Sequence, residues 1–471
     1  MTETTQAAAP PVASPTLLGR LRGSAAARDG FYVLAAQGIA TLIALGADSF
    51  LFRELQKSER GILSAAFGLR TVLLYIADMG MTMATVRIGS SFVAKGMLTE
   101  ANAVFRRALV FRWLAAIVVG GVVLLLTPTL AKQLLETPTR PNLVYACAAA
   151  LLGMTTVSWG LDVAQCRRRM KSYFVQYVGE AILRACAIVI VLRVMEVHTE
   201  KFSELILWTM AAGVILAAIV SVLVERDAFA DAKGFGLSAP VGVSTEMRSF
   251  IPFATAATCL GMVGIYVELF LLQHLRTPEE TAVFEGARRL ASLLPLLTAG
   301  FATIMLPRAS ALETPAQCLG YIRKALIVTA PLAVLISGAL ALSASFIVPL
   351  LWGTKYDASI PLLRWMCLAH ALSFVATPVS FVLFPLKRPG ILVILNGLAL
   401  ALSIGIGITL VKSHGAMGAV WSMLIVRGVM AVVMAGVLIS IARKLKVAKQ
   451  GSELLAEHQT PPAPPFQGGE N

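Results

Sequence analysis

Long apolar segments recur along the whole chain, and each is long enough to cross a membrane as a helix. The hydrocarbon core of a bilayer is about 30 Å thick and needs about 20 helical residues. About twelve such segments alternate with short connections that hold most of the charged residues. This pattern excludes a single core buried in water, and it predicts an all-α membrane protein of about twelve transmembrane helices. The expected spans are residues 31–52, 61–86, 108–131, 142–165, 174–195, 204–224, 250–274, 281–306, 325–350, 361–385, 390–411 and 416–442.

The composition agrees with a chain that faces lipid rather than water. Only 14 % of the residues are charged, whereas 57 % are hydrophobic. A soluble domain has roughly 25 % charged residues, so this chain lacks the polar surface that water requires. The formal net charge of +14 raises nucleic-acid binding as an alternative. The positive charge is divided among short clusters between the apolar segments, however, so we expect no nucleic-acid partner.

The distribution of Lys and Arg predicts the orientation, because cytoplasmic loops of membrane proteins carry an excess of both residues. With the amino terminus in the cytoplasm, 23 of the 40 Lys and Arg residues lie on the cytoplasmic side, 9 lie on the opposite side and 8 lie within spans. The connection after the first span is the exception, since it holds Arg53, Lys57 and Arg60. Both termini are therefore expected in the cytoplasm.

The chain divides into two membrane lobes and three polar regions. Residues 1–30 are expected to form a cytoplasmic tail, and because they hold no apolar core with a cleavage site, the first span should be retained. Residues 31–224 form the expected N-lobe, with helices one to six. Residues 225–249 form a cytoplasmic linker, and residues 250–442 form the C-lobe, with helices seven to twelve. The tail at 443–471 ends in a Pro- and Gly-rich stretch and is expected to be disordered.

The two halves show an internal repeat. Residues 48–60 read DSFLFRELQKSER and residues 268–280 read ELFLLQHLRTPEE, so that an offset of 220 aligns Asp48 with Glu268. Chance similarity between apolar stretches is the alternative, but the polar matches at the loop favour a duplication. The two halves have the same orientation in the membrane and are joined by a cytoplasmic linker. Such halves are expected to be related by a pseudo-two-fold axis along the membrane normal. The sequence thus predicts two pseudo-symmetric six-helix lobes around a central cavity.

Three segments carry a resemblance to a known family. Residues 51–90 hold Arg and Leu before a short polar loop with Gly, and then a helix that closes on an Ala-Asp-Met-Gly turn at 77–80. Residues 348–365 hold an apolar–Gly–x–x–Tyr loop before a helix that begins Pro-Leu-Leu. In residues 414–428, small side chains lead into one of the last helices. In this order and spacing, the chain resembles the polysaccharide (O-antigen and exopolysaccharide) flippases of the multidrug/oligosaccharidyl-lipid/polysaccharide exporter superfamily.

The resemblance implies a membrane transporter rather than an enzyme. Such a flippase moves a polyprenyl-pyrophosphate-linked oligosaccharide from the cytoplasmic to the periplasmic leaflet of the bacterial inner membrane, for lipopolysaccharide or exopolysaccharide synthesis. Its expected partners are the lipid-linked oligosaccharide and membrane lipids, with a polysaccharide polymerase and chain-length proteins as further candidates. No cofactor is expected.

All basic residues within the expected spans are arginine. A guanidinium group keeps its charge and binds phosphate through two parallel hydrogen bonds, so arginines in a cavity suit a lipid pyrophosphate. Arg70 and Arg427 lie near the middle of their spans and have no acidic residue three or four positions away. The repeat places Arg70 opposite Arg288 and Arg289. We predict that these four side chains line a central substrate-binding cavity, because charges within a membrane usually face an interior space or a partner.

The other intramembrane arginines have simpler expected roles. Arg184 follows Glu180 by one helical turn and should pair with it. Glu285 precedes both Arg288 and Arg289 by about one turn and can pair well with only one of them. Three more arginines lie near span ends, where side chains extend to the membrane surface; these are Arg112, Arg193 and Arg364.

Four acidic residues also fall within or beside the spans. Asp48 and Glu268 are equivalent in the repeat, and they are candidates for a gate or a cation-coupling site, with structural pairing to a loop Lys or Arg as the alternative. Asp162 is expected to form an ion pair with Arg167. Asp78 lies in the family-like turn, where we expect a structural role.

Motifs for other activities are absent from the sequence. No GxxxxGK[ST], GxSxG or HExxH occurs, and the six cysteines and five histidines do not fall at ligand spacing. We expect no catalytic residue, metal site or disulfide. A cation-coupled multidrug exporter of the related branch remains an alternative, although it should line its cavity with acids. A membrane glycan polymerase or ligase is disfavoured by short outer loops, and an assembly scaffold also remains open.

Overall fold

The computed structural model describes residues 25–194, 202–230, 241–296, 315–382 and 389–458. Within these ranges the secondary structure is helical, and ten helices are long and apolar enough to cross a membrane. The chain is therefore a multi-pass membrane protein. The last of these ten helices contains two of the expected spans. Gly415 separates the two, because its φ of 57° and ψ of −134° break the helix. The second part of the expected span 281–306 lies outside the described residues.

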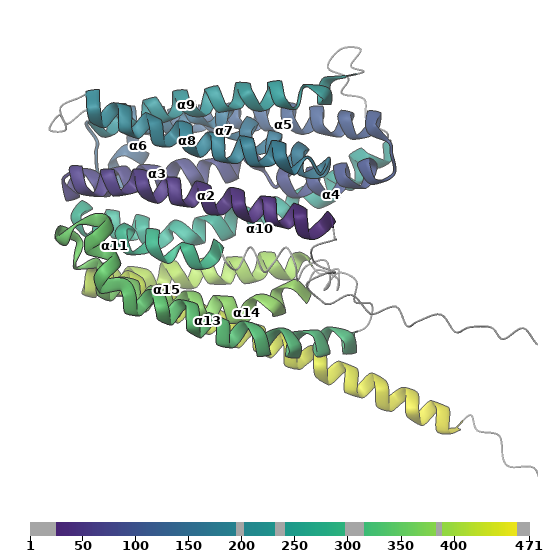
Figure 1. Ribbon diagram of the computed structural model, residues 1–471. Helices are drawn as coiled ribbons and strands as arrows, with labels where there is room; N and C mark the ends of the chain where they lie inside the picture. Colours follow the sequence, from purple (N-terminus) through teal and green to yellow (C-terminus); the bar gives the residue numbers. More distant parts are fainter. Residues whose placement is uncertain (1–24, 195–201, 231–240, 297–314, 383–388, 459–471) are drawn as a thin grey trace, which may run out of the picture.

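The N-lobe contains α2 to α9 and a short 3-10 helix (Figure 1). Their bounds are α2 Ala25–Glu54, α3 Lys57–Asp78, α4 Met81–Ala94, α5 Leu98–Leu125, α6 Thr127–Gln133, α7 Asn142–Cys166, α8 Met170–Val194, α9 Phe202–Val224 and η1 Arg226–Phe229. The C-lobe follows, with α10 Val241–Leu275, α11 Pro278–Ala291, α13 Pro315–Trp352, η2 Thr354–Tyr356, α14 Ser359–Val382 and α15 Pro389–His458.

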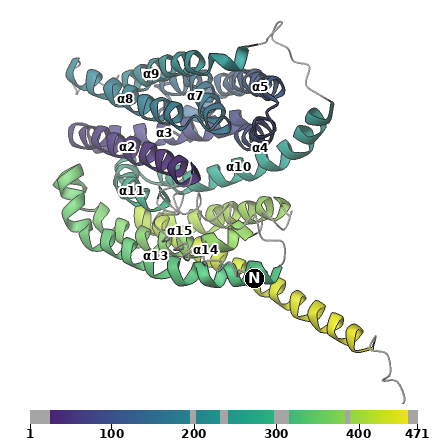
Figure 2. The ribbon, with the colours of Figure 1, turned by 45° about the vertical axis from the view of Figure 1, so that its right-hand side comes forward.

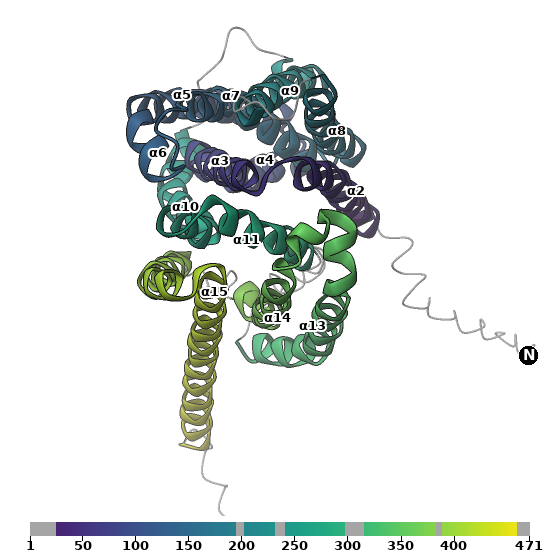
Figure 3. The ribbon, with the colours of Figure 1, turned by 90° about the vertical axis from the view of Figure 1, so that its left-hand side faces the viewer.

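The helix pairs of the two lobes repeat each other. In the N-lobe, α2 packs on α8, α3 packs on α7, and α7 packs on α5 and α9. In the C-lobe, α10 packs on α15, α11 packs on α14, and α14 packs on α13 and α15. The two lobes lie on opposite sides of the view in Figure 3, and α3 meets α10 and α11 between them. This arrangement confirms the expected fold class of two pseudo-symmetric lobes.

The second expected span, 61–86, is interrupted in the structure. Met79 and Gly80 both adopt the left-handed conformation, with φ values of 46° and 66°, and this ends α3 and starts α4 in a new direction. Asp78 stabilises the break because its carboxylate accepts hydrogen bonds from the backbone N–H and the hydroxyl of Thr82, in the first turn of α4. The Ala-Asp-Met-Gly turn is therefore a helix break inside the N-lobe.

Three expected region boundaries differ from the structure. The helix α2 begins at Ala25, so the last part of the expected tail 1–30 is already helical. The helix α10 begins at Val241, so the last part of the expected linker 225–249 is already helical. The helix α15 continues to His458, so the tail at 443–471 is helical in its first half rather than disordered from residue 443. Figure 2 shows this end of α15 projecting away from the bundle. A run of Lys, Leu, Ala and Glu favours helix here, and the Pro- and Gly-rich residues come only after it.

Candidate functional site

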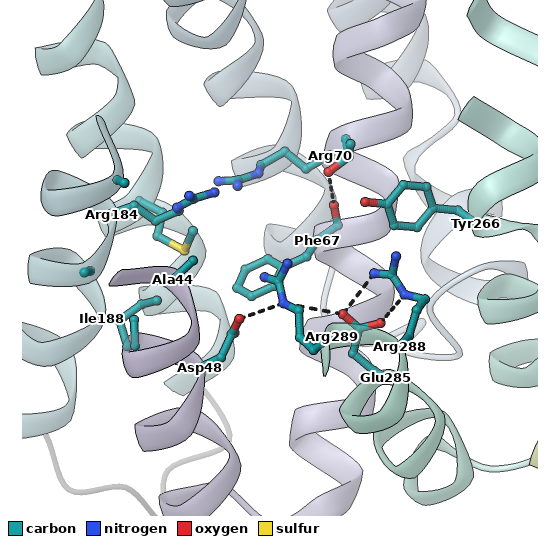
Figure 4. Close-up of a pocket in the computed structure, with 15 residues that line it drawn as sticks. Ala44, Asp48, Phe67, Arg70, Arg184, Ile188, Tyr266, Glu285, Arg288 and Arg289 are labelled. Atoms are coloured by element: carbon teal, nitrogen blue, oxygen red, sulfur yellow. Dashed lines mark hydrogen bonds and ion pairs between the residues drawn. The ribbon is translucent and has the colours of Figure 1, made fainter. Parts of the chain in front are cut away.

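A small cavity lies where helices of both lobes meet (Figure 4). Its volume is about 70 Å³, and side chains from α2, α3, α8, α9, α10 and α11 line it. Four arginines face this space together with two acidic residues; they are Arg70, Arg184, Arg288, Arg289, Asp48 and Glu285. We call it the basic cavity, because its lining has an excess of two positive charges.

Local sequence explains the shape of the basic cavity. Small side chains, Ala44 and Ala47 on α2 and Ala181 and Ala185 on α8, leave room that the long arginines enter. On α11, Glu285 stands three and four residues before the two arginines, so one helix face presents all three. The cavity therefore combines a wall of alanines with a charged face of α11.

Two of the four arginines are neutralised by acidic side chains. Arg288 donates to Glu285 from Nε at 2.6 Å and from NH2 at 2.9 Å, and its guanidinium lies 4.7 Å from the ring centroid of Tyr266. The Nε of Arg289 lies 2.6 Å from Asp48 and 3.9 Å from Glu285. Glu285 thus pairs well with only Arg288, as predicted.

The other two arginines are poorly compensated. Arg184 has one acidic partner, Glu180, at 3.7 Å on the same helix, which confirms the predicted pair. Arg70 is 8 % exposed, its Nε has no hydrogen-bond partner, and no ion pair to it is found among the described residues. The side chains of Arg70 and Arg184 point toward each other in Figure 4. Two facing guanidinium groups in a buried space favour an anion between them.

The structure separates Arg427 from the other predicted cavity residues. Arg427 donates to His370 Nδ1 at 2.8 Å and to Ser373 at 3.2 Å, and it lines a second cavity of about 180 Å³ between α10 and α15. Glu268 lines the same second cavity, beside Ser403. Arg427 therefore does not share one cavity with Arg70, Arg288 and Arg289 as predicted, because its side chain contacts α14 inside the C-lobe.

The two acidic residues that the repeat equates have different surroundings. Asp48 contacts Arg60 on its own lobe and Arg289 on the other lobe. Glu268 is equally buried, but it lies inside the C-lobe in the second cavity. Only Asp48 is in a position to link the lobes, and a cation-coupling role for Glu268 stays a prediction.

The lobes are in close contact at the membrane end where α2 passes into α3, which is on the left in Figure 1. The Ser49 hydroxyl donates to the backbone carbonyl of Leu351 at 2.6 Å, and Lys355 Nζ donates to the carbonyls of Arg53 and Leu55 at 2.7 and 2.8 Å. Phe52 packs on Trp352 with ring centroids 4.3 Å apart. We call this contact between residues 49–61 and residues 350–359 the closed end.

A buried ion cluster in the N-lobe was not predicted. Arg112 of α5 is fully buried and pairs with Asp78 of α3 at 2.9 Å and with Asp162 of α7 at 2.5 Å. The expectation that Arg112 extends to the membrane surface is therefore wrong. Asp162 was expected to pair with Arg167, which instead donates to Asn102 at 2.5 Å. The three charges come from three helices far apart in sequence, so no local spacing marks them.

A family model described as polysaccharide biosynthesis protein matches residues 26–313, which is more than half of the chain. No curated protein sequence matches the chain. Known structures with the same fold include a multidrug resistance MATE family transporter of the MOP superfamily in an inward-facing conformation, with 12 % identity, a TM-score of 0.68, and coverage of 90 % of this chain and 96 % of the other. A structure described as the outward-facing conformation of a multidrug resistance MATE family transporter of the MOP superfamily gives 14 % identity, a TM-score of 0.64, and coverage of 89 % of this chain and 97 % of the other.

A third structure is a MOP superfamily transporter from Pyrococcus furiosus, with 16 % identity, a TM-score of 0.64, and coverage of 91 % of this chain and 98 % of the other. Its description states that the reverse polarity of its binding pocket suggests a different function. At these identities the likeness establishes the fold alone, so the charge of the basic cavity has to be interpreted from the residues of this chain.

Proposed function

Because this chain belongs to the polysaccharide biosynthesis protein family, we propose that it flips a polyprenyl-pyrophosphate-linked oligosaccharide across the bacterial inner membrane. Transport would run from the cytoplasmic to the periplasmic leaflet and would supply lipopolysaccharide or exopolysaccharide synthesis. The distribution of Lys and Arg supports cytoplasmic termini, which makes the closed end the periplasmic end. A polysaccharide polymerase and chain-length proteins are the partners that such a product requires.

The excess of positive charge in the basic cavity carries this proposal. Each phosphate of a pyrophosphate diester carries about one negative charge near pH 7, and guanidinium groups bind such oxygens through paired hydrogen bonds. Arg70 has no ion pair among the described residues, and Arg184 has only the 3.7 Å contact with Glu180, so both can bind an anion. An uncompensated Arg70 facing lipid would cost about 2.5–3.5 kcal/mol or more, whereas a bound pyrophosphate would satisfy it.

The size of the basic cavity indicates how the substrate would be held. A volume of about 70 Å³ has room for a few waters but not for a sugar repeat unit. The lobes would therefore have to separate to make room for the sugars, as alternating access between two repeats allows. The apolar lipid tail can remain in the bilayer, so that only the pyrophosphate and the sugars need the polar interior.

A cation-coupled multidrug exporter is the main alternative, because the MATE structures share the fold. A cationic drug would meet a lining with four arginines and two acids in the basic cavity. It would gain nothing from Arg70 and Arg184 and would be repelled by both. A membrane glycan polymerase or ligase is the other alternative, and it would make a longer product rather than move an unchanged one.

The proposal is tested with purified protein in proteoliposomes and a lipid-linked oligosaccharide that carries a fluorescent label. We expect label accessibility to change sides in the presence of the wild-type protein, with no change in oligosaccharide length. Arg70→Ala should lower this rate about tenfold or more, because one charge-assisted bidentate contact contributes about 1.5–3 kcal/mol. Arg70→Lys should lower it less, since the charge remains without the planar pair of donors.

The matched control is Arg364→Ala, which removes an exposed arginine from α14, away from the basic cavity. It should transport at the wild-type rate. Normal transport by folded Arg70→Ala would reject the cavity as the pyrophosphate site. Efflux of a cationic dye without movement of the oligosaccharide would favour the drug exporter, and a lengthened oligosaccharide would favour the polymerase.

A further inference from the structure

One carboxylate of the basic cavity, that of Asp48, is connected to the closed end. This side chain is buried, and guanidinium groups of both lobes face it. Its Oδ1 accepts a hydrogen bond from Arg60 NH2 at 3.2 Å, and its Oδ2 lies 2.6 Å from Arg289 Nε. Arg60 belongs to α3 in the N-lobe, whereas Arg289 belongs to α11 in the C-lobe. Asp48 therefore forms an ion pair across the boundary between the lobes, in which the carboxylate is buried and the Arg289 side chain is 30 % exposed.

The contact between Asp48 and Arg289 is close but poorly aligned. Neither Asp48 Oδ2 nor Arg289 Nε has a partner in hydrogen-bond geometry, despite the short separation of these two atoms. Glu285 does not replace Asp48, because its two oxygens are used by Arg288. Arg289 thus keeps an unused donor at the edge of the basic cavity, where an anion can compete with Asp48 for it.

Asp48 is connected to the closed end through Arg60. The Arg60 guanidinium is fully buried and lies 4.1 Å from the ring centroid of Phe52. The Phe52 ring in turn contacts Trp352 and Tyr356 of the C-lobe, at centroid distances of 4.3 and 5.0 Å. A change in the position of Asp48 therefore reaches the aromatic contact that keeps the two lobes together.

We propose that Asp48 is a displaceable latch: a pyrophosphate in the basic cavity takes its place on Arg289, and the closed end then opens. This inference rests on the proposed function, because the displacing anion is the pyrophosphate of the transported lipid. A ligand shifts a conformational equilibrium only when it binds one state better than the other. Here the open state offers Arg289 free of Asp48, so the anion binds that state more tightly.

The latch is tested by measuring distances across the closed end in the full-length protein. Spin labels are placed at Glu54→Cys and Asp357→Cys, which are exposed on opposite sides of the contact, after replacement of the six native cysteines. Inorganic pyrophosphate serves as the probe. We expect a longer distance to appear in the otherwise wild-type protein when pyrophosphate is added, and Arg70→Ala should abolish this response.

The decisive variant is Asp48→Asn, measured without pyrophosphate. It removes the ion pair between the lobes, so the ratio of open to closed molecules should rise about tenfold or more. Arg289→Gln breaks the same pair from the other lobe and should also open the closed end, which provides the test if Asp48→Asn does not fold. Glu180→Gln is the matched control, because it removes an acid near the basic cavity that does not link the lobes. It should leave the distance unchanged.

The outcomes separate the latch from the proposed function. If folded Asp48→Asn and Arg289→Gln both stay closed, the latch is wrong, whether or not pyrophosphate binds. If pyrophosphate binds to the wild-type protein through Arg70 but the distance does not change, the latch is wrong and the cavity stands. If pyrophosphate does not bind at all, its displacement of Asp48 is refuted and the proposed anion site fails as well.

Discussion

Replacing Arg112 with Met should strongly destabilise the protein without touching the basic cavity. Arg112 is fully buried and lies 2.9 Å from Asp78 and 2.5 Å from Asp162, which are themselves each 4 % exposed. Methionine matches the volume of the side chain but leaves two carboxylates facing each other without a cation. Removal of one partner from a buried ion pair costs about 3–5 kcal/mol.

A loss of this size raises the fraction of unfolded protein by a factor of roughly 150 to 5,000. Proton uptake by one of the stranded carboxylates limits the loss. The triple variant Arg112→Met, Asp78→Asn and Asp162→Asn removes all charge at once and should recover most of the stability, because a neutral packed core often replaces a buried ion cluster at little cost.

The measurement is unfolding by sodium dodecyl sulfate in mixed micelles, followed by tryptophan fluorescence. Trp159 is suited to this readout, since it is fully buried on α7, one turn from Asp162. Arg193→Met on α8 is the control, because Arg193 is exposed, and its effect should stay within about 0.5 kcal/mol. A single Arg112→Met variant as stable as the wild type would refute the reasoning that the cluster holds α3, α5 and α7 together.

Other predictions concern orientation, symmetry and the closed end. Reporter tags at Gly236 and after Lys449 should report the cytoplasm, and tags at Thr277 and Thr354 the opposite side; a reporter active outside at Gly236 would contradict the model with both termini inside. The helices α2 and α3 should superpose on α10 and α11 by rotation about an axis along the membrane normal, and unrelated pairs would reject the duplication. Gly61→Ala should open the closed end in the spin-label measurement, because a Cβ there meets the backbone of Pro278. Gly338→Ala, which meets nothing within 4 Å, should not open it.

The sequence was informative about features that depend only on order along the chain, such as the length of a membrane span and the spacing of residues on one helix. The length of an apolar run specifies a span, and the repeat of 48–60 at 268–280 was enough to predict two related lobes. Spacing along one helix was equally reliable: Glu285 with Arg288 and Glu180 with Arg184 pair as their three- and four-residue separations predict. The presence of Arg70 and Arg289 at one cavity also followed, because the repeat relates their helices.

Tertiary structure decided which charges meet across helices. Nothing in the spacing of Asp78, Arg112 and Asp162 shows that they converge, since the break at Met79 and Gly80 and the packing of α5 on α7 bring them together. Arg427 resembles Arg70 in sequence, with mid-span depth and no local acid, yet it lies in a different cavity of the C-lobe. The physical reason is that a charge in a membrane must find a partner, while the sequence specifies only the partners on its own helix. The partners on other helices depend on how the helices pack, and the contact of Asp48 with Arg289 between the lobes is one example.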